Sequence, residues 1–234
     1  MFTNPICVAL DTPDAAHAAQ LARTLRGQVG LMKVGMEQFY AQGRDGYAQV
    51  AAEGVPVFLD LKLHDIPNTV AQGLTSLLSL APAPAIVNVH ASGGPAMLEA
   101  AAKAVDGRAK LIAVTVLTSL SDHDIHAAGF DPEASTAVTV VKLARLAKSC
   151  GLDGVVCSPH DIVSIKQACG ADFMTVVPGV RPAGADVQDQ KRVATPEAAR
   201  AAGAEILVIG RPITQAEDPA AAASTIAQAL GVTA

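Results

Sequence analysis

Short apolar runs of strand length recur along the chain, and Ala-rich segments with helical spacing separate them. Three of the helical segments are Ala15–Leu25, Val138–Ser149 and Pro219–Leu230. Eight apolar runs are predicted to be strands buried on both faces: Ile6–Asp11, Leu31–Gly35, Pro56–Lys62, Ala85–His90, Leu111–Thr118, Gly154–Ser158, Phe173–Val177 and Glu205–Gly210. A strand that is apolar on both faces and is followed by a helix, repeated, indicates a parallel sheet covered by helices.

The number and spacing of these units favour a closed barrel. They recur about every 28 residues, and eight of them fill 234 residues, close to the ~250 typical of this fold. An open doubly wound sheet would place a G-x-G-x-x-G turn after the first strand, but Asp11-Thr12-Pro13-Asp14 stands there. No linker or low-complexity tract divides the chain. We therefore expect an α/β protein in which residues 1–234 form one domain, a single (β/α)8 TIM barrel.

Composition and charge argue against nucleic acids and membranes as partners. The chain is 50% hydrophobic and 17% charged, which is typical of a folded protein. A net charge of −5 and 3% aromatic residues without Trp argue against nucleic-acid binding, which needs basic surfaces and stacking side chains. No apolar run reaches membrane-spanning length, no signal peptide is evident, and the four cysteines form no C-x-x-C pair. We expect a soluble cytoplasmic protein with reduced thiols and no membrane association.

Polar residues stand where the predicted strands end. These residues are Asp11, Lys33, Asp60, Lys62, His90, Thr118, Ser119, Gly210 and Arg211. In a barrel of parallel strands the carboxyl ends share one mouth, and the active site of this fold is built there. We therefore expect these side chains to converge on one site.

The third predicted strand carries charges inside an apolar run. Because side chains alternate along a strand, Asp60 and Lys62 should share the face opposite to the leucines around them. The leucines need the helical layer, so the two charges should face the barrel interior, where each requires a partner. Lys33 on the neighbouring strand can complete an alternating chain of charge. A purely structural ion pair is the alternative, but charges at this mouth favour chemistry.

Asp65 lies beyond this strand. Pro67 forces Ile66 into an extended conformation, and Asn68 or Thr69 can cap the next helix. Asp65 is poorly placed to fold back into its own barrel, whereas it can reach into that of a neighbouring subunit.

The last two strands end in signals for an anion. Gly210 permits close backbone approach, and Arg211 supplies a forked donor for phosphate oxygens. The polar loop after the seventh strand contains Arg181 and runs to Gln190, with glycines that suit a lid. Loops after strands seven and eight commonly bind phosphate in this fold. Together they predict a phosphorylated ligand.

Several histidines carry weaker signals. His123 and His126, with Asp122 and Asp124, resemble metal ligands in type only, and we expect a solvated polar surface there. His90 is expected to be a packed or hydrogen-bonded residue. No H-E-x-x-H, Walker A or G-x-S-x-G motif occurs.

Residues 58–69, Phe-Leu-Asp-Leu-Lys-Leu-His-Asp-Ile-Pro-Asn-Thr, resemble the signature of the orotidine 5′-phosphate decarboxylase family in its short bacterial form. The D-x-K-x-x-D core is shared with related sugar-phosphate barrels, whereas the Ile-Pro-Asn-Thr continuation is specific. Further matches, in the order of the family, are residues 8–11, 33–37, 115–119, 156–159, 178–181, 189–192 and 210–211.

The resemblance implies decarboxylation of orotidine 5′-monophosphate to UMP in de novo pyrimidine synthesis, without metal or organic cofactor. It implies that Lys62 protonates the pyrimidine ring, that Asp60 stands beside the substrate carboxylate, and that Lys33 belongs to the charged network. It also implies a homodimer in which Asp65 and Thr69 enter the site of the partner. The substrate-binding residues that it implies are Asp11 and Lys33 for the ribose, Thr118 near the base, and Arg181, Gln190, Gly210 and Arg211 for the phosphate.

Two alternatives remain open from the sequence. One is a metal-dependent sugar-phosphate decarboxylase or aldolase on the same barrel, which would lose activity in EDTA. The other is a non-catalytic barrel that senses a nucleotide, although such a protein would not need Asp60, Lys62 and Asp65 together.

Overall fold

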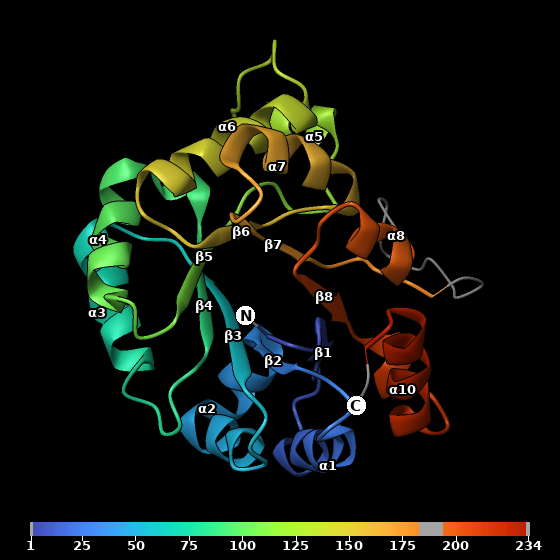
Figure 1. The fold of residues 1–234 in the computed structure, drawn as a ribbon. Helices are drawn as coiled ribbons and strands as arrows, with labels where there is room; N and C mark the ends of the chain where they lie inside the picture. The colour runs from blue at the N-terminus through green and yellow to red at the C-terminus, as the bar shows by residue number, and fades with distance from the viewer. Residues whose placement is uncertain (1, 183–193, 233–234) are drawn as a thin grey trace.

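The computed structural model describes residues 2–182 and 194–232. Eight parallel strands close into a barrel in chain order, with β1 paired to both β2 and β8 (Figure 1). The strands are β1 Ile6–Ala9, β2 Leu31–Gly35, β3 Val57–Leu63, β4 Ile86–His90, β5 Lys110–Val114, β6 Gly154–Val156, β7 Met174–Val177 and β8 Ile206–Ile209. The predicted (β/α)8 TIM barrel is confirmed.

Helices surround the barrel on the outside (Figure 1). They are α1 Ala15–Leu25, α2 Met36–Ala51, α3 Pro67–Leu77, α4 Pro95–Val105, α5 Asp122–Ala127, α6 Thr136–Ser149, α7 Ile162–Cys169, α8 Pro196–Ala201, α9 Arg211–Thr214 and α10 Pro219–Ala229. The 3-10 turns Ala91–Gly93 and Pro159–Asp161 follow β4 and β6. Across the described residues, none of the helices has the length and apolar character needed to span a bilayer.

Side-chain alternation along the strands separates two apolar layers. Ile6 and Val8 face outward into the large core between strands and helices, whereas Cys7 and Ala9 face the barrel interior. The interior layer consists of Cys7, Ala9, Leu31, Phe58, Ile86, Ile112, Val176, Ile206 and Val208. Polar side chains above this layer face the carboxyl-end mouth, where the site lies.

Several strands end earlier than the sequence predicted. β1 stops at Ala9 instead of Asp11, β5 at Val114 instead of Thr118, and β8 at Ile209 instead of Gly210. The Thr115 N–H still donates to the Val156 carbonyl, and beyond it the chain leaves the sheet. An apolar run can therefore be longer than the hydrogen-bonded strand within it. The mouth of the barrel still buries side chains where the backbone no longer pairs with a neighbouring strand.

Candidate active site

An alternating chain of charge stands at the carboxyl end of β1, β2 and β3. Lys33 Nζ lies 3.0 Å from Asp11 Oδ1 and 3.5 Å from Asp60 Oδ2. Lys62 Nζ lies 2.7 Å from Asp60 Oδ1. Lys33 and Asp60 are buried, with side chains 10% and 11% exposed. The sequence predicted that Lys33 would interleave with Asp60 and Lys62, and the ion pairs confirm it, whereas the contact of Lys33 with Asp11 adds a fourth member.

The backbone at Lys62 departs from the regular alternation that the sequence suggested. Leu59 and Leu61 face the helical layer as predicted, but the register between β3 and β4 shifts between Leu59 and Leu63. Within that bulge Lys62 adopts a φ of 53°. This left-handed conformation costs a non-glycine residue roughly 1–2 kcal/mol, and strain of this kind collects at functional sites.

Asn88 on β4 is a site residue that the sequence analysis missed. It is 1% exposed, its Nδ2 donates to Asp60 Oδ1 at 2.7 Å, and its Oδ1 accepts the Lys62 N–H at 2.8 Å. The sequence could have indicated its position, because Asn88 lies two residues after the interior residue Ile86 and side chains alternate along a strand. A polar residue at an interior position of an apolar strand requires partners.

The charged network shifts the pKa of two of its members. Burial by itself would raise the pKa of Asp60, but Lys33, Lys62 and the hydrogen bonds from Lys62 and Asn88 hold it below its usual value. Burial would likewise lower the pKa of Lys33, but the charges of Asp60 and Asp11 raise it above its usual value. Both groups are therefore ionised at neutral pH.

Gly35 at the end of β2 leaves room for this network. A Cβ at this position would lie 2.9 Å from Lys33 Nζ and 3.2 Å from Asp11 Oδ1. A side chain here would make the ends of the Lys33 and Asp11 side chains shift, so glycine leaves their ion pair undisturbed.

Two adjoining cavities open at the mouth, and they share Lys33, Pro178 and Val208. The one beside Lys62 and Asp60 has a volume of about 180 Å³. Its remaining lining residues are Phe58, Val114, Val116, Leu117, Thr118, Val156 and Val176. Thr118 therefore lines the same cavity as Lys33, Asp60 and Lys62, and it does so from a loop beyond β5. An ammonium group and a carboxylate thus face a mainly apolar chamber.

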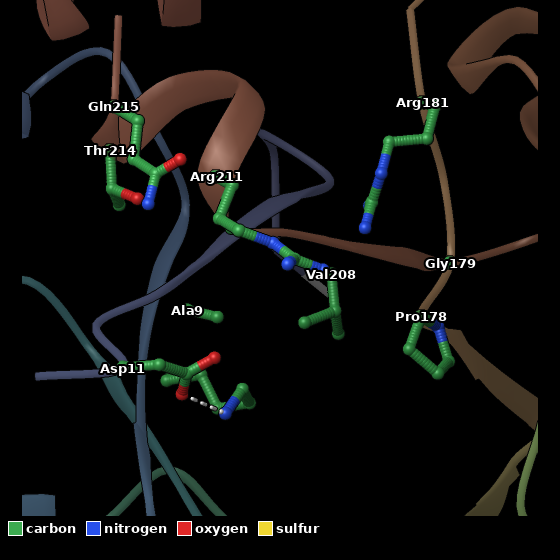
Figure 2. A pocket seen from close by; sticks show the side chains of 11 residues that line it. Ala9, Asp11, Pro178, Gly179, Arg181, Val208, Arg211, Thr214 and Gln215 are labelled. Carbon is green, nitrogen blue, oxygen red and sulfur yellow. Dashed lines mark hydrogen bonds and ion pairs between the residues drawn. The ribbon is translucent and has the colours of Figure 1, made fainter. Parts of the chain in front are cut away.

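The second cavity, of about 370 Å³, lies at the end of β7 and β8. Arg181 and Arg211 point into it from opposite sides, and Asp11 lies at its other end (Figure 2). Its other lining residues are Ala9, Gly179, Gly210, Thr214 and Gln215. The sequence analysis missed Thr214 and Gln215, which α9 brings to the rim. Gln190 and residues 183–193 of the loop proposed as a lid lie outside the described residues.

Asp65 and Thr69 are not brought to these cavities. Both are exposed, and Asp65 Oδ1 accepts the N–H of Ile66 at 2.7 Å. The prediction that Asn68 or Thr69 caps α3 is wrong. Ile66 occupies the capping position without a side-chain bond, and Pro67 begins the helix, where its missing N–H costs nothing.

The remaining polar residues have local roles. Asp122 accepts hydrogen bonds from Thr136, and Asp124 forms a capping box with Ser121. The rings of His90 and His64 lie 5.6 Å apart, and burial together with His64 lowers the pKa of His90. No cluster of three or more His, Cys, Asp or Glu side chains with metal-binding geometry occurs within residues 2–182 and 194–232.

Comparison with known protein families and with curated sequences identifies one family. A family model described as orotidine 5′-phosphate decarboxylase / HUMPS family matches residues 4–226. An orotidine 5′-phosphate decarboxylase from Paramagnetospirillum magneticum is 49% identical, over 98% of this chain and 99% of its own. Its counterpart from Novosphingobium aromaticivorans is 51% identical, over 96% and 98%.

Solved structures agree with these relatives. The crystal structure of orotidine 5′-phosphate decarboxylase from Lactobacillus acidophilus superposes with a TM-score of 0.81 at 37% identity, covering 97% of this chain and 99% of that one. The chain therefore belongs to the orotidine 5′-phosphate decarboxylase / HUMPS family.

Proposed function

We propose that residues 1–234 act as one catalytic domain that decarboxylates orotidine 5′-monophosphate to UMP and CO2 in de novo pyrimidine synthesis, without metal or organic cofactor. One observation carries the proposal. A buried Asp60 paired with a partly buried Lys62 faces a mainly apolar cavity, and this cavity continues into a second one that receives two arginines. The first suits a pyrimidine ring, and the second suits a phosphate.

Lys62 supplies the central step. When the bond between the ring carbon and the carboxyl carbon breaks, CO2 leaves and the electron pair remains on the ring carbon, which has no adjacent carbonyl to accept it. A fixed cation beside that carbon stabilises the developing charge. The Lys62 ammonium then transfers a proton to the carbon, and water restores the proton of Lys62.

Asp60 and Lys33 prepare Lys62 for this role. Asp60 lies 2.7 Å from the Lys62 ammonium and fixes its position. Its negative charge also repels the substrate carboxylate more than the neutral CO2 that leaves. Lys33 keeps Asp60 ionised, because the attraction between them helps to hold the pKa of Asp60 below its usual value.

The remaining residues bind the parts of the nucleotide that do not react. Lys33 lines both cavities and Asp11 lines the second one, so their ion pair suits the ribose hydroxyls, and Thr118 in the first cavity suits the base. The phosphate-binding residues are Arg181, Gln190, Gly210 and Arg211. Binding energy from the remote phosphate contributes to the rate when it orders the substrate and closes the site.

A direct assay tests the reaction. Purified protein in EDTA should consume orotidine monophosphate, followed by its absorbance, and should release UMP and CO2. Activity that disappears in EDTA and returns with Mg²⁺ would favour a metal-dependent decarboxylase or aldolase. Tight UMP binding without turnover would identify a nucleotide sensor.

We further propose that the active unit is a homodimer in which Asp65 and Thr69 complete the site of the partner. Both are exposed and lie outside the cavities of their own chain. Large apolar side chains are exposed nearby, one directly after Asp65 and two on α2, the helix that follows the neighbouring strand β2. Ile66 is 66% exposed, Tyr40 71% and Met36 44%. A two-fold interface covers such side chains and exchanges the two loops symmetrically.

Complementation between two inactive variants tests the shared site. In a heterodimer of Lys62→Ala and Asp65→Ala chains, one site collects both lesions and the other collects neither. Mixing should therefore restore up to about half of the wild-type activity per heterodimer. A mixture that stays inactive after confirmed subunit exchange would place Asp65 within its own chain.

A cytoplasmic location is also proposed. It is supported by Cys7, Cys150 and Cys169, which are buried thiols outside any disulfide, as expected in a reducing compartment.

A further inference from the structure

Asn88 occupies a special place opposite the bulge of β3. The strand partners of Leu59 and Leu63 are Val87 and Val89. Three residues of β3, Asp60 to Lys62, therefore face a single residue of β4. A bulge of this kind interrupts the backbone ladder and leaves groups that need other partners.

The side chain of Asn88 bridges this gap with both of its ends. Its Oδ1 accepts the Lys62 N–H at 2.8 Å, and its Nδ2 donates to Asp60 Oδ1 at 2.7 Å. The same Asp60 oxygen accepts a hydrogen bond from Lys62 Nζ. Backbone and ammonium of Lys62 are thus joined into one closed ring of hydrogen bonds through Asn88 and Asp60.

The chemistry of the partners fixes the orientation of the amide. A backbone N–H needs an acceptor and a carboxylate needs a donor, so only one of the two amide orientations satisfies both. Leucine has a similar shape and offers neither group. Aspartate offers the acceptor but places a second carboxylate oxygen against Asp60.

We propose that Asn88 is a positioning residue that holds Lys62 in its left-handed backbone conformation and aims its ammonium group at the reacting carbon. The strained φ of 53° at Lys62 persists because its N–H is bonded to a buried amide. Asn88 acts through Lys62 and Asp60, and not on the substrate. This inference rests on the proposed function, since the reaction defines where the ammonium must point.

The first test replaces Asn88 by leucine. Asn88→Leu should lower kcat by at least about tenfold, the scale of one buried hydrogen bond to a charged group. The affinity for UMP should stay within about threefold, because the substrate contacts are intact. Hydrogen exchange at the Lys62 amide should become at least about tenfold faster, because the amide has lost its acceptor.

The second test replaces Asn88 by aspartate and also decides the matter if Asn88→Leu does not fold. Asn88→Asp keeps the acceptor, so the Lys62 amide should remain protected from exchange. Its second oxygen opposes Asp60, so kcat should fall at least as far as in Asn88→Leu, again with UMP affinity retained.

Thr175→Val is the matched control. Thr175 is also fully buried and hydrogen-bonded, but it lies at the amino end of β7 and contacts Glu205. Its kcat should stay within about twofold of the wild type. The inference is overturned if the Asn88 variants keep kcat within that range, or if UMP affinity falls as much as kcat.

Failure of the proposed function has a different signature. If the wild-type protein does not decarboxylate orotidine monophosphate, the proposed reaction is wrong and so is the catalytic purpose of Asn88. Exchange at the Lys62 amide still reports whether Asn88 holds that backbone.

Discussion

Two lysine–carboxylate pairs of similar burial lie at opposite ends of the barrel. At the carboxyl end, Lys62 and Asp60 are 23% and 11% exposed, with 2.7 Å between their charged atoms. At the amino end, Lys166 and Glu205 are 14% and 18% exposed, with 2.5 Å between theirs. Burial and ion-pair distance alone do not distinguish the two pairs.

The partners of each lysine make the difference. The Lys166 ammonium donates to Glu205 and to the carbonyls of Ala171 and Phe173, and these use its three hydrogens. Among the residues that the structure describes, the Lys62 ammonium donates to Asp60 alone, and Lys62 lines a cavity. A saturated ion pair ties elements together, whereas an ion pair with spare donors beside a cavity can act on a ligand.

Removal of Lys62 should have the largest effect. Lys62→Ala should lower kcat by at least about a thousandfold, ~4 kcal/mol in the barrier. The affinity for UMP should stay within about tenfold, ~1.4 kcal/mol. Steady-state kinetics and calorimetric UMP titration provide the measurement. Turnover close to that of the wild type would remove the catalytic role from this pair.

Arg211 should show a smaller, ligand-dependent effect. Arg211→Ala removes a charge from the second cavity, the proposed phosphate site, so binding of UMP should weaken by about 1.5–3 kcal/mol. Binding of uridine, which has no phosphate, should hardly change. Competition assays with both ligands measure the difference. Equal losses for the two ligands would place Arg211 outside the phosphate site.

Lys166 should matter for stability and not for turnover. Lys166→Ala leaves Glu205 Oε1 and two carbonyls without the Lys166 donor, which should lower the free energy of unfolding by about 1–3 kcal/mol. Urea unfolding measures this change, and kcat should stay within about twofold of the wild type. A large drop in kcat in the folded variant would contradict the distinction between the two pairs.

The smallest effect concerns acid stability at Asp60. Its pKa in the folded protein lies below the ordinary value of 3.8, so the unfolded chain binds more protons between the two values. The contribution of Asp60 is present above the ordinary value and is lost as the pH falls through the folded pKa. The slope is at most about 1.4 kcal/mol per pH unit, the limit for one proton.

Asp60→Asn is the reference for this measurement. Urea unfolding of both proteins from pH 6 downward isolates Asp60, because the other carboxyl groups titrate in both. The stability of the wild type relative to the variant should decrease below about pH 4, where the unfolded carboxyl group takes up its proton. Parallel curves would show that the network does not lower the pKa of Asp60.

The sequence by itself determined the barrel and the ionic core of the site. Strand periodicity is a local property. The eight strands and the outward face of the β3 leucines could therefore be predicted without knowledge of any tertiary contact. The same alternation predicted that the charged side chains of Asp60 and Lys62 face the barrel interior. The order of the strands placed Lys33 beside them at one mouth.

Only the tertiary structure decided how Lys62 is held and where the strands end. The left-handed φ at Lys62 depends on three residues of β3 facing one residue of β4, and that register belongs to neither strand alone. The role of Asn88 has the same origin. Thr214 and Gln215 reach the second cavity only because α9 turns over the mouth. Strand register and the lining of a cavity both depend on segments that are far apart in the sequence. A local sequence pattern therefore does not predict them.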